Sequence, residues 1–229
     1  MADNRAVDHG GDDHGERGGG RARSGTLDYR CGCGELRARV GVVARDRPRR
    51  AICHCRDCQG FQHALGTAET VLDGHGGTEI LMVSPAALEI VAGGERLAAL
   101  RLYPKGLLRW YAGCCDTPLG NTPAMPRFPH LGLIAAVLID VNGADALERE
   151  AGAVRERIFG AEATNGMPPG AHRKVPLTAI PPIIAAVAGR LRRGDHRRSP
   201  FLDANGEPIV RPRVLAEEER RALAPYARV

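Results

Sequence analysis

Cysteine side chains are grouped along this chain in a way that indicates metal chemistry. Thiolates are strong ligands for soft or borderline metal ions such as zinc. Isolated buried cysteines usually act as small apolar side chains, but burial does not explain tight grouping. An odd number of cysteines would also leave one thiol over in a disulfide framework. The seven cysteines fall in three clusters: Cys31 and Cys33; Cys53, Cys55 and Cys58; Cys114 and Cys115.

The spacing within the first two clusters favours shared metal ligation. In extended backbone, Cys31 and Cys33 point to the same side because side chains alternate. A turn after Cys55 would let Cys58 fold back toward it, as in the C-x-x-C knuckles of zinc ribbons. An iron–sulfur cluster is the competing interpretation, but its usual cysteine spacings are not matched. The clusters therefore predict bound metal, with zinc as the expected ion.

The composition is that of a folded globular protein. Hydrophobic residues make up 43% of the 229 residues and charged residues 26%, as in ordinary soluble domains. The N-terminus lacks the apolar stretch of a secretory signal, and no apolar run is long enough to cross a bilayer. Aromatic residues are only 4% of the chain, which disfavours base-stacking surfaces. We expect a cytoplasmic protein with no membrane span and no nucleic acid partner.

The elements that must position the cysteines change in character along the chain. Residues 1–25 are dominated by glycine and charge, which predicts a disordered tail. Residues 26–142 contain short apolar or alternating runs between turn signals, which predict a β domain. Residues 143–229 carry apolar residues at helical spacing, which predicts a helical C-terminal extension.

Within these segments, six runs are expected as strands and three as helices. Gly93 and Gly94 are expected to connect two strands as a hairpin. The proline-rich segment Asp116–Pro129 is expected as a loop or a set of turns. The expected strands are Leu36–Val40, Glu79–Val83, Leu88–Val91, Leu97–Tyr103, Leu107–Ala112 and Leu131–Val141, and the expected helices are Ala146–Phe159, Leu177–Arg193 and Ala216–Leu223.

Three motifs in combination resemble those of a known family. They are C-x-C-G at Cys31–Gly34, C-H-C-x-x-C at Cys53–Cys58, and a third cysteine motif before the dipeptide Thr117-Pro118. Over residues 26–142 the chain thereby resembles the glutathione-dependent formaldehyde-activating enzyme family, which shares its fold with the centromere-protein-V-like proteins. It looks most like a branch with the string Arg109–Asn121 and a helical C-terminal extension. The resemblance implies a mainly β, Mss4-like zinc-binding fold.

The resemblance also implies how the ligands divide between two zinc ions. The first and third motifs of the family make a closed four-thiolate site with a structural role. The middle motif holds a second zinc with three thiolates. Carried over to this chain, Cys31, Cys33 and Cys115 belong to the structural site, and Cys53, Cys55 and Cys58 belong to the second site.

One departure from the family concerns the fourth structural thiolate. The family usually has C-x-x-C-G before Thr/Ser-Pro, and this chain has Ala112 where the first of those cysteines is expected. Cys114 is the favoured replacement, although neighbouring cysteines on one metal require a turned backbone. The alternatives are a water or a non-cysteine ligand.

A three-thiolate zinc would keep a fourth position for water or substrate, which is the mark of a catalytic site. The family resembled implies carbon–sulfur lyase chemistry on adducts of glutathione with formaldehyde. We therefore expect a zinc-dependent lyase that takes a small thiol and an aldehyde, with Cys53, Cys55 and Cys58 as the catalytic metal ligands. Arg109 could clamp the carboxylate of the thiol, although a strand arginine is more often paired at the surface.

Four polar residues near the middle motif are further candidates. His54 would point away from the metal in an extended stretch. His63 could shuttle a proton, or could simply lie on the surface. Asp57 and Gln59 lie within the knuckle, where hydrogen bonds to thiolates are common.

Two other functions compete with the lyase. A non-enzymatic zinc scaffold could bind a protein or a nucleic acid through the arginine-rich stretch Arg190–Arg198, which a charged helix end explains more simply. Alternatively, the neighbouring Cys114 and Cys115 could oxidise in a thiol redox sensor, but thiolates in a structural metal site are usually protected.

Overall fold

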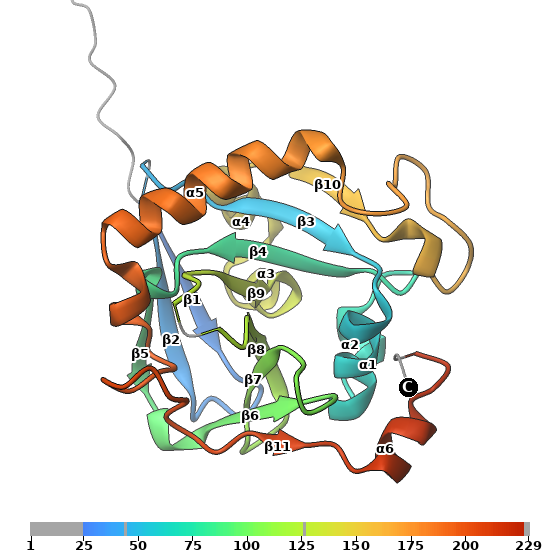
Figure 1. Cartoon of the computed structure of the whole chain (residues 1–229), viewed down its shortest axis with the longest axis horizontal. Coiled ribbons are helices and arrows are strands. Elements are labelled where there is room, and N and C mark those ends of the chain that lie inside the picture. The colour runs from blue at the N-terminus through green and yellow to red at the C-terminus, as the bar shows by residue number, and fades with distance from the viewer. Residues whose placement is uncertain (1–24, 44, 126, 227–229) are drawn as a thin grey trace, which may run out of the picture.

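The computed structural model describes residues 25–43, 45–125 and 127–226, and this part of the chain is mainly β, as the sequence predicted. Its strands form two sheets, of three and eight strands (Figure 1). The expected tail over residues 1–25 lies outside the described residues except for Gly25, where the first strand begins.

The smaller sheet is antiparallel and has the strand order β1-β2-β5. It consists of β1 (Gly25–Arg30), β2 (Arg37–Val42) and β5 (Leu88–Ala92). In β2, exposed charged residues alternate with buried apolar ones. This confirms the half-buried strand that the alternating pattern predicted, because side chains of a strand point in turn to its two faces.

The larger sheet has an antiparallel centre and a parallel strand at each edge. Both edge strands come from the segment 143–229, which therefore is not wholly helical. In spatial order the strands are β10 (Val154–Ile158), β3 (Arg49–Cys53), β4 (Thr78–Val83), β9 (Leu131–Ile134), β8 (Thr117–Thr122), β7 (Leu108–Ala112), β6 (Leu97–Arg101) and β11 (Arg213–Val214).

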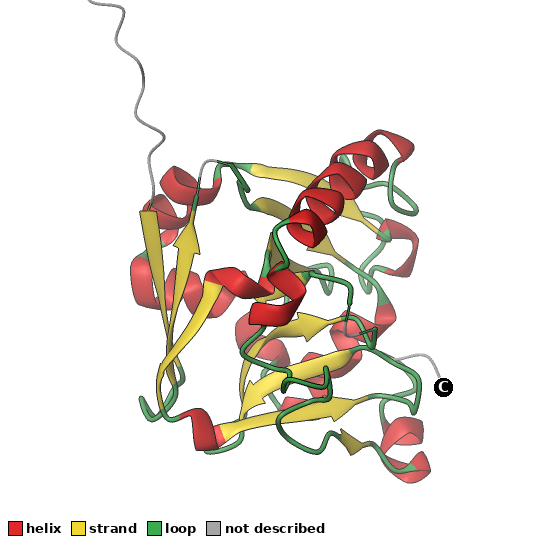
Figure 2. Cartoon of the chain, turned by 60° about the vertical axis from the view of Figure 1, so that its left-hand side comes forward, coloured by secondary structure: helices red, strands yellow, loops and turns green. Residues whose placement is uncertain are grey.

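The main hydrophobic core lies between the two sheets. The three-stranded sheet stands at one side of the larger one (Figure 2), and the core takes buried side chains from both, such as Leu27 of β1 and Leu133 of β9. Trp110 of β7 is fully buried in this core and stacks on Phe201 with 4.5 Å between ring centroids. Phe201 ties the C-terminal segment into this core.

Helices cover the outside of the sheets. α5 runs along the top of the larger sheet next to β3 and β10 (Figure 1), with prolines in its first turn, where a missing N–H costs nothing. Among the described residues, none of the helices is long and apolar enough to cross a membrane. The helices are α1 (Arg56–Leu65), α2 (Ala68–Val71), α3 (Ala135–Asn142), α4 (Ala144–Ala151), α5 (Ile180–Arg192) and α6 (Glu217–Ala222).

Two expected elements change type half-way along. The expected strand Leu131–Val141 is a strand only as far as Ile134 and continues as α3. The expected helix Ala146–Phe159 ends at Ala151, where Gly152 turns the chain with a φ of 78°, and its second half is strand β10. Short apolar runs do not distinguish a buried strand from a buried helix, because both lack polar interruptions.

Two expected connections are also wrong. β5 and β6 do not form a hairpin, since they belong to different sheets. Gly93 redirects the chain between them with a φ of 71°, and it lies so close to Glu35 that a Cβ would meet the carbonyl oxygen at 2.2 Å. The segment Asp116–Pro129 is not all loop, because β8 occupies its first half. Pro118 is accommodated there beside a register shift between β7 and β8, a position that tolerates the missing N–H.

A buried ion-pair network fixes α5 to the sheets. The side chain of Asp46, only 8% exposed, accepts hydrogen bonds from Arg190 at 2.9 Å and from Arg193 at 2.9 Å. Asp195, 3% exposed, accepts from Arg193 at 2.9 Å and from Arg198 at 2.6 Å. Three arginines of the stretch Arg190–Arg198 are thus occupied by carboxylates of the chain itself.

Candidate metal centres

Four sulfur atoms from distant parts of the chain meet beside the main core. Cys31 and Cys33 lie in the turn after β1, and Cys114 and Cys115 lie in the turn between β7 and β8. The four Sγ atoms all lie within 4.8 Å of one another. The separations are 3.5 Å for Cys31–Cys33, 3.8 Å for Cys31–Cys114 and 3.3 Å for Cys33–Cys114. Zn–S bonds of about 2.3 Å in a tetrahedron separate sulfurs by about 3.8 Å, so this four-cysteine cluster fits such an ion.

The backbone around Asp116 explains how two neighbouring cysteines join one cluster. Asp116 has a φ of 53°, a left-handed conformation that few non-glycine residues adopt. The Cys115 N–H donates to the carbonyl of Ala112 at 3.3 Å, which closes the turn. Ala112 itself continues β7 and is fully buried in the core. The structure therefore brings Cys114 to the position that the sequence left open.

Polar groups around the four-cysteine cluster favour a negatively charged sulfur. The Leu36 N–H donates to Cys31 Sγ at 3.2 Å. Burial raises the pKa of Cys115, but hydrogen bonds to Thr117 and to backbone outweigh it and bring the pKa to about 6. Burial and its thiol neighbours raise the pKa of Cys114. Without a cation, the cluster cannot hold all of its sulfurs as thiolates, and a bound metal ion would supply the missing positive charge.

A second group of three sulfurs is built around the start of α1. Cys53 ends β3, Cys55 is the N-cap residue of α1, and Cys58 lies in its first turn. The N–H of Cys58 donates to the carbonyl of Cys55 at 3.0 Å, so the chain folds back as the spacing predicted. The three Sγ atoms lie within 4.8 Å of one another, and no further cysteine, histidine or carboxylate of the described residues joins them.

Close contact shifts the pKa values of the three thiols of this three-cysteine cluster in opposite directions. Hydrogen bonds with Cys53 and Cys55, and the charge of Arg109, hold the pKa of Cys58 well below its usual range. Hydrogen bonds with Cys55 and Cys58, together with burial, raise the pKa of Cys53. A hydrogen bond with Cys53 lowers the pKa of Cys55, but Cys58 and burial raise it to about 12. A single metal ion would relieve this competition for protons.

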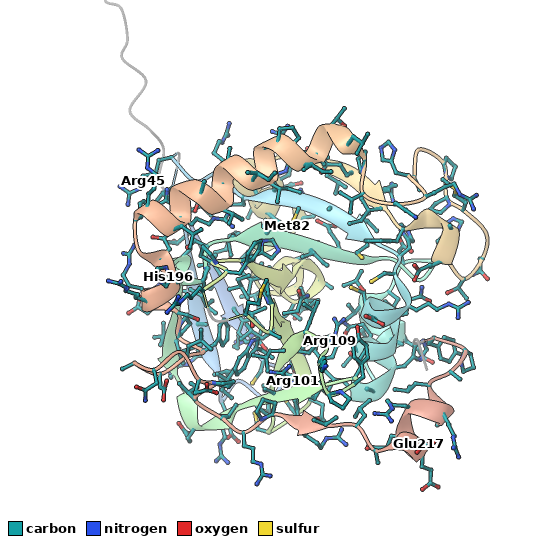
Figure 3. The ribbon with its side chains drawn as sticks, in the orientation of Figure 1. Arg45, Met82, Arg101, Arg109, His196 and Glu217 are labelled. Carbon is teal, nitrogen blue, oxygen red and sulfur yellow. The ribbon has the colours of Figure 1, made fainter. Side chains whose placement is uncertain are left out.

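Arg109 of β7 is buried against the three-cysteine cluster. Its residue exposure is 2%, its guanidinium hydrogen-bonds to Cys58, and its Cζ lies 5.3 Å from the ring centroid of Phe61 on α1. Figure 3 shows Arg109 on the side of its strand that faces this helix. The alternative of a surface-paired strand arginine is therefore wrong.

His54 and Gln59 serve the packing of the cluster segment against the C-terminal part of the chain. His54 is fully buried, and its Nδ1 lies 3.2 Å from the carbonyl oxygen of Ile158 in β10. The Gln59 amide donates to the carbonyls of His54 at 2.7 Å and of Glu162 at 2.9 Å. No hydrogen bond from Gln59 to a sulfur is seen, so its contacts are structural.

Asp57 and His63 point to other neighbours. Asp57 accepts a hydrogen bond from the Tyr103 hydroxyl at 2.8 Å. His63 stacks on Tyr226 with 3.6 Å between ring centroids, and burial lowers its pKa. The structure thus places His63 against the C-terminal segment at the end of α1 opposite the cysteines.

Several buried polar atoms without a hydrogen-bond partner belong to the cluster segment, to α1 or to the strands beside them. Seven buried side-chain N or O atoms among the described residues have no hydrogen-bond partner, and five of them lie within the cluster segment, on α1 or beside it. Buried polar groups are usually paired, so a concentration of unpaired ones marks a place for a missing ion, water or ligand. The five are His54 Nε2, Asp57 Oδ1, Gln62 Nε2, Thr78 Oγ1 and Arg109 Nη1.

Thr78 and Gln62 are residues that sequence reasoning missed. Thr78 pairs directly with Cys53 across β3 and β4, so both side chains lie on one face of the sheet. Gln62 follows Cys58 by one helical turn on α1. The helical spacing could have indicated Gln62, whereas Thr78 is brought to the cluster only by the strand register.

The fold and the two clusters define a cysteine-rich β protein with two candidate metal centres. The chain belongs to a family of unknown function, DUF6151, whose model matches residues 24–211 and so includes every cysteine. No curated protein matches the chain. A crystal structure of a Rhodobacter sphaeroides protein is similar over 56% of this chain and 97% of its own, with 20% identity and a TM-score of 0.35.

Proposed function

We propose that the protein is a zinc-dependent carbon–sulfur lyase that acts on adducts of a small thiol with an aldehyde. The observation that carries the proposal is the three-cysteine cluster, which no fourth protein ligand joins among the described residues. A zinc ion held by three side chains keeps one position for a substrate, whereas a closed four-thiolate site does not.

Zinc is the ion we propose for both clusters. All-thiolate sites select soft or borderline ions, and zinc accepts both the four-ligand and the three-ligand arrangement. The four-cysteine cluster would then be structural, since it joins the turn after β1 to the turn between β7 and β8. The resemblance of the cysteine motifs to those of the formaldehyde-activating enzymes supports the same division.

Zinc bound at the three-cysteine cluster would make a thiol at its fourth position acidic enough to act as a thiolate at neutral pH. The residues of the chain then have two tasks. Cys53, Cys55 and Cys58 hold the ion at the end of β3 and the start of α1, where the partly exposed Cys55 marks the side open to solvent. Arg109 offsets part of the negative charge of the three thiolates.

The proposed reaction is reversible and needs no oxidant or reductant. In the adding direction, the sulfur electron pair forms the bond to the aldehyde carbon, the carbonyl π pair moves to oxygen, and a proton from water completes the hydroxyl group. In the lyase direction, the hydroxyl loses its proton and the carbon–sulfur bond breaks toward sulfur. A glutathione-like thiol and formaldehyde are the substrates that the motif resemblance suggests.

Cobalt substitution tests the open position directly. We expect glutathione or 2-mercaptoethanol to strengthen the thiolate-to-cobalt absorption of the substituted protein, because a further sulfur would join the ion. Cys58→Ser should abolish this response, and His63→Gln, at the other end of α1, should keep it. A wild-type protein that holds cobalt but shows no response to either thiol would contradict the proposal.

A further inference from the structure

Arg109 carries a buried donor that has no partner in the chain. Its residue exposure is 2%, and its Nη1 has no hydrogen-bond partner. A buried charged donor without an acceptor is costly, so native proteins rarely keep one unless a ligand completes it. The guanidinium also hydrogen-bonds to Cys58 and lies over the ring of Phe61. Nη1 is therefore the guanidinium nitrogen that we consider for a ligand.

The place of this donor relative to the three sulfurs limits what the ligand can be. Arg109 hydrogen-bonds to Cys58, and a ligand sulfur completing a tetrahedron would lie about 3.8 Å from Cys58 Sγ. The acceptor for Nη1 must then be attached close to that ligand sulfur. A positive donor in a buried site selects an anionic oxygen over a neutral one.

We propose that the three-cysteine cluster takes a thiol compound with an anionic oxygen group on its sulfur-bound carbon, and that Arg109 Nη1 binds this oxygen. This inference rests on the proposed function. Two sources supply such an oxygen. One is a carboxylate of the thiol itself, and the other is the alkoxide that forms when a thiolate adds to an aldehyde. In the second case Arg109 is a catalytic residue, because it stabilises charge that develops during the reaction.

The test uses the full-length, cobalt-substituted protein and two thiols that differ in charge. Mercaptoacetate carries a carboxylate on its sulfur-bound carbon, and ethanethiol carries a methyl group there. We expect wild-type protein to bind mercaptoacetate at least about tenfold more tightly than ethanethiol, the usual size of a charge-assisted hydrogen bond. Arg109→Gln should remove this preference, Arg109→Lys should retain part of it, and Arg39→Gln, an exposed arginine of β2, should leave it unchanged.

A second experiment distinguishes the carboxylate of the thiol from the alkoxide as the oxygen that Nη1 binds. The rate of formaldehyde addition to ethanethiol, which has no carboxylate, should fall at least about tenfold in Arg109→Gln if the bound oxygen is the alkoxide. If Arg109→Gln loses the preference for mercaptoacetate but keeps the rate of formaldehyde addition, the oxygen that Nη1 binds is the carboxylate of the thiol. Metal content and thermal melts show whether the variant is folded. If it is not, the tighter binding of mercaptoacetate than of ethanethiol by wild-type protein still tests the proposal.

The outcomes also distinguish this inference from the proposed function. Thiols that bind the cobalt protein without any preference for mercaptoacetate, together with an unchanged addition rate in Arg109→Gln, would overturn the role of Arg109 and leave the open site intact. Absence of any thiol response would overturn both.

Discussion

Cys31 and Cys55 are both cluster residues, but their surroundings differ. Cys31 is 1% exposed and packs with the main core, whereas Cys55 is partly exposed at the start of α1. We expect Cys31→Ser to unfold the protein, because a structural metal site contributes on the order of several kcal/mol to folding. Cys55→Ser should leave a folded protein with one metal ion fewer.

Thermal melts combined with elemental analysis check this difference. Wild-type protein should hold two zinc ions, one for each cluster. A finding that Cys55→Ser destabilises the protein as much as Cys31→Ser would show that both clusters are structural, and detection of iron in place of zinc would contradict the choice of metal.

At the scale of single residues, the sequence predicted which side chains matter better than how they are arranged. The cysteines were recognised from their types and spacing. Cys114 was favoured as the fourth thiolate, but a water or a non-cysteine ligand stayed open. The turn that brings Cys114 to the cluster depends on the left-handed backbone of Asp116, a conformation that few non-glycine residues adopt and that the sequence did not indicate. The isolation of Arg109 from solvent depends on α1 packing over β7, which is a tertiary contact.

At the scale of elements, the predictions from sequence were wrong where one apolar run contains the end of a strand and the start of a helix. The run after Leu131 starts as a strand between β4 and β8 and then becomes α3. Asn142 ends that helix, where its amide donates to the carbonyl of Asp28 at 2.7 Å and its Oδ1 accepts from the N–H of Asp28 at 2.9 Å. These hydrogen bonds attach the end of the helix to β1. They join residues far apart in the chain, so a local sequence pattern does not indicate them.

The carboxylate of Asp46 offers a test of how α5 is held. Asp46→Ala would leave Arg190, which is 3% exposed, without its bidentate partner. Removing one member of a buried ion pair typically costs about 3–5 kcal/mol, so we expect a loss of that size in the free energy of unfolding. Chemical denaturation of the metal-loaded protein measures it.

Arg198→Ala serves as the matched control. Its side chain is 59% exposed, and its partner Asp195 keeps Arg193 and Ser84 as further partners. We therefore expect a loss of about 1 kcal/mol or less, as for a surface ion pair. Equal losses for Asp46→Ala and Arg198→Ala would mean that α5 is not anchored through Asp46.

At the scale of the whole molecule, residues on both sides of the expected boundary at 142/143 build one sheet. β10 pairs with β3, and Phe201 stacks on Trp110 in the main core. We therefore expect a fragment of residues 25–142 to aggregate, because β3 would become an exposed edge strand and the core would lose an aromatic ring. Size-exclusion chromatography and circular dichroism of this fragment check the expectation.

A fragment of residues 25–226 is the control, since it keeps both edge strands and α5. It should elute as a folded species and melt cooperatively. Cooperative melting of the 25–142 fragment would instead show that the first part of the chain is an independent domain, as the change of sequence character at residue 143 predicted.

The two clusters differ in how much chain they close. The three-cysteine cluster spans only Cys53 to Cys58, whereas Cys33 and Cys114 are 81 residues apart. A short segment can capture an ion while the chain is still being synthesised, but the four-cysteine cluster must wait until β7 has been made, and it closes a loop whose entropy cost is larger. An ion that also binds the unfolded chain stabilises the fold less. If each cluster binds one ion, as we propose, the ion captured first would therefore contribute less to stability than the ion that arrives last.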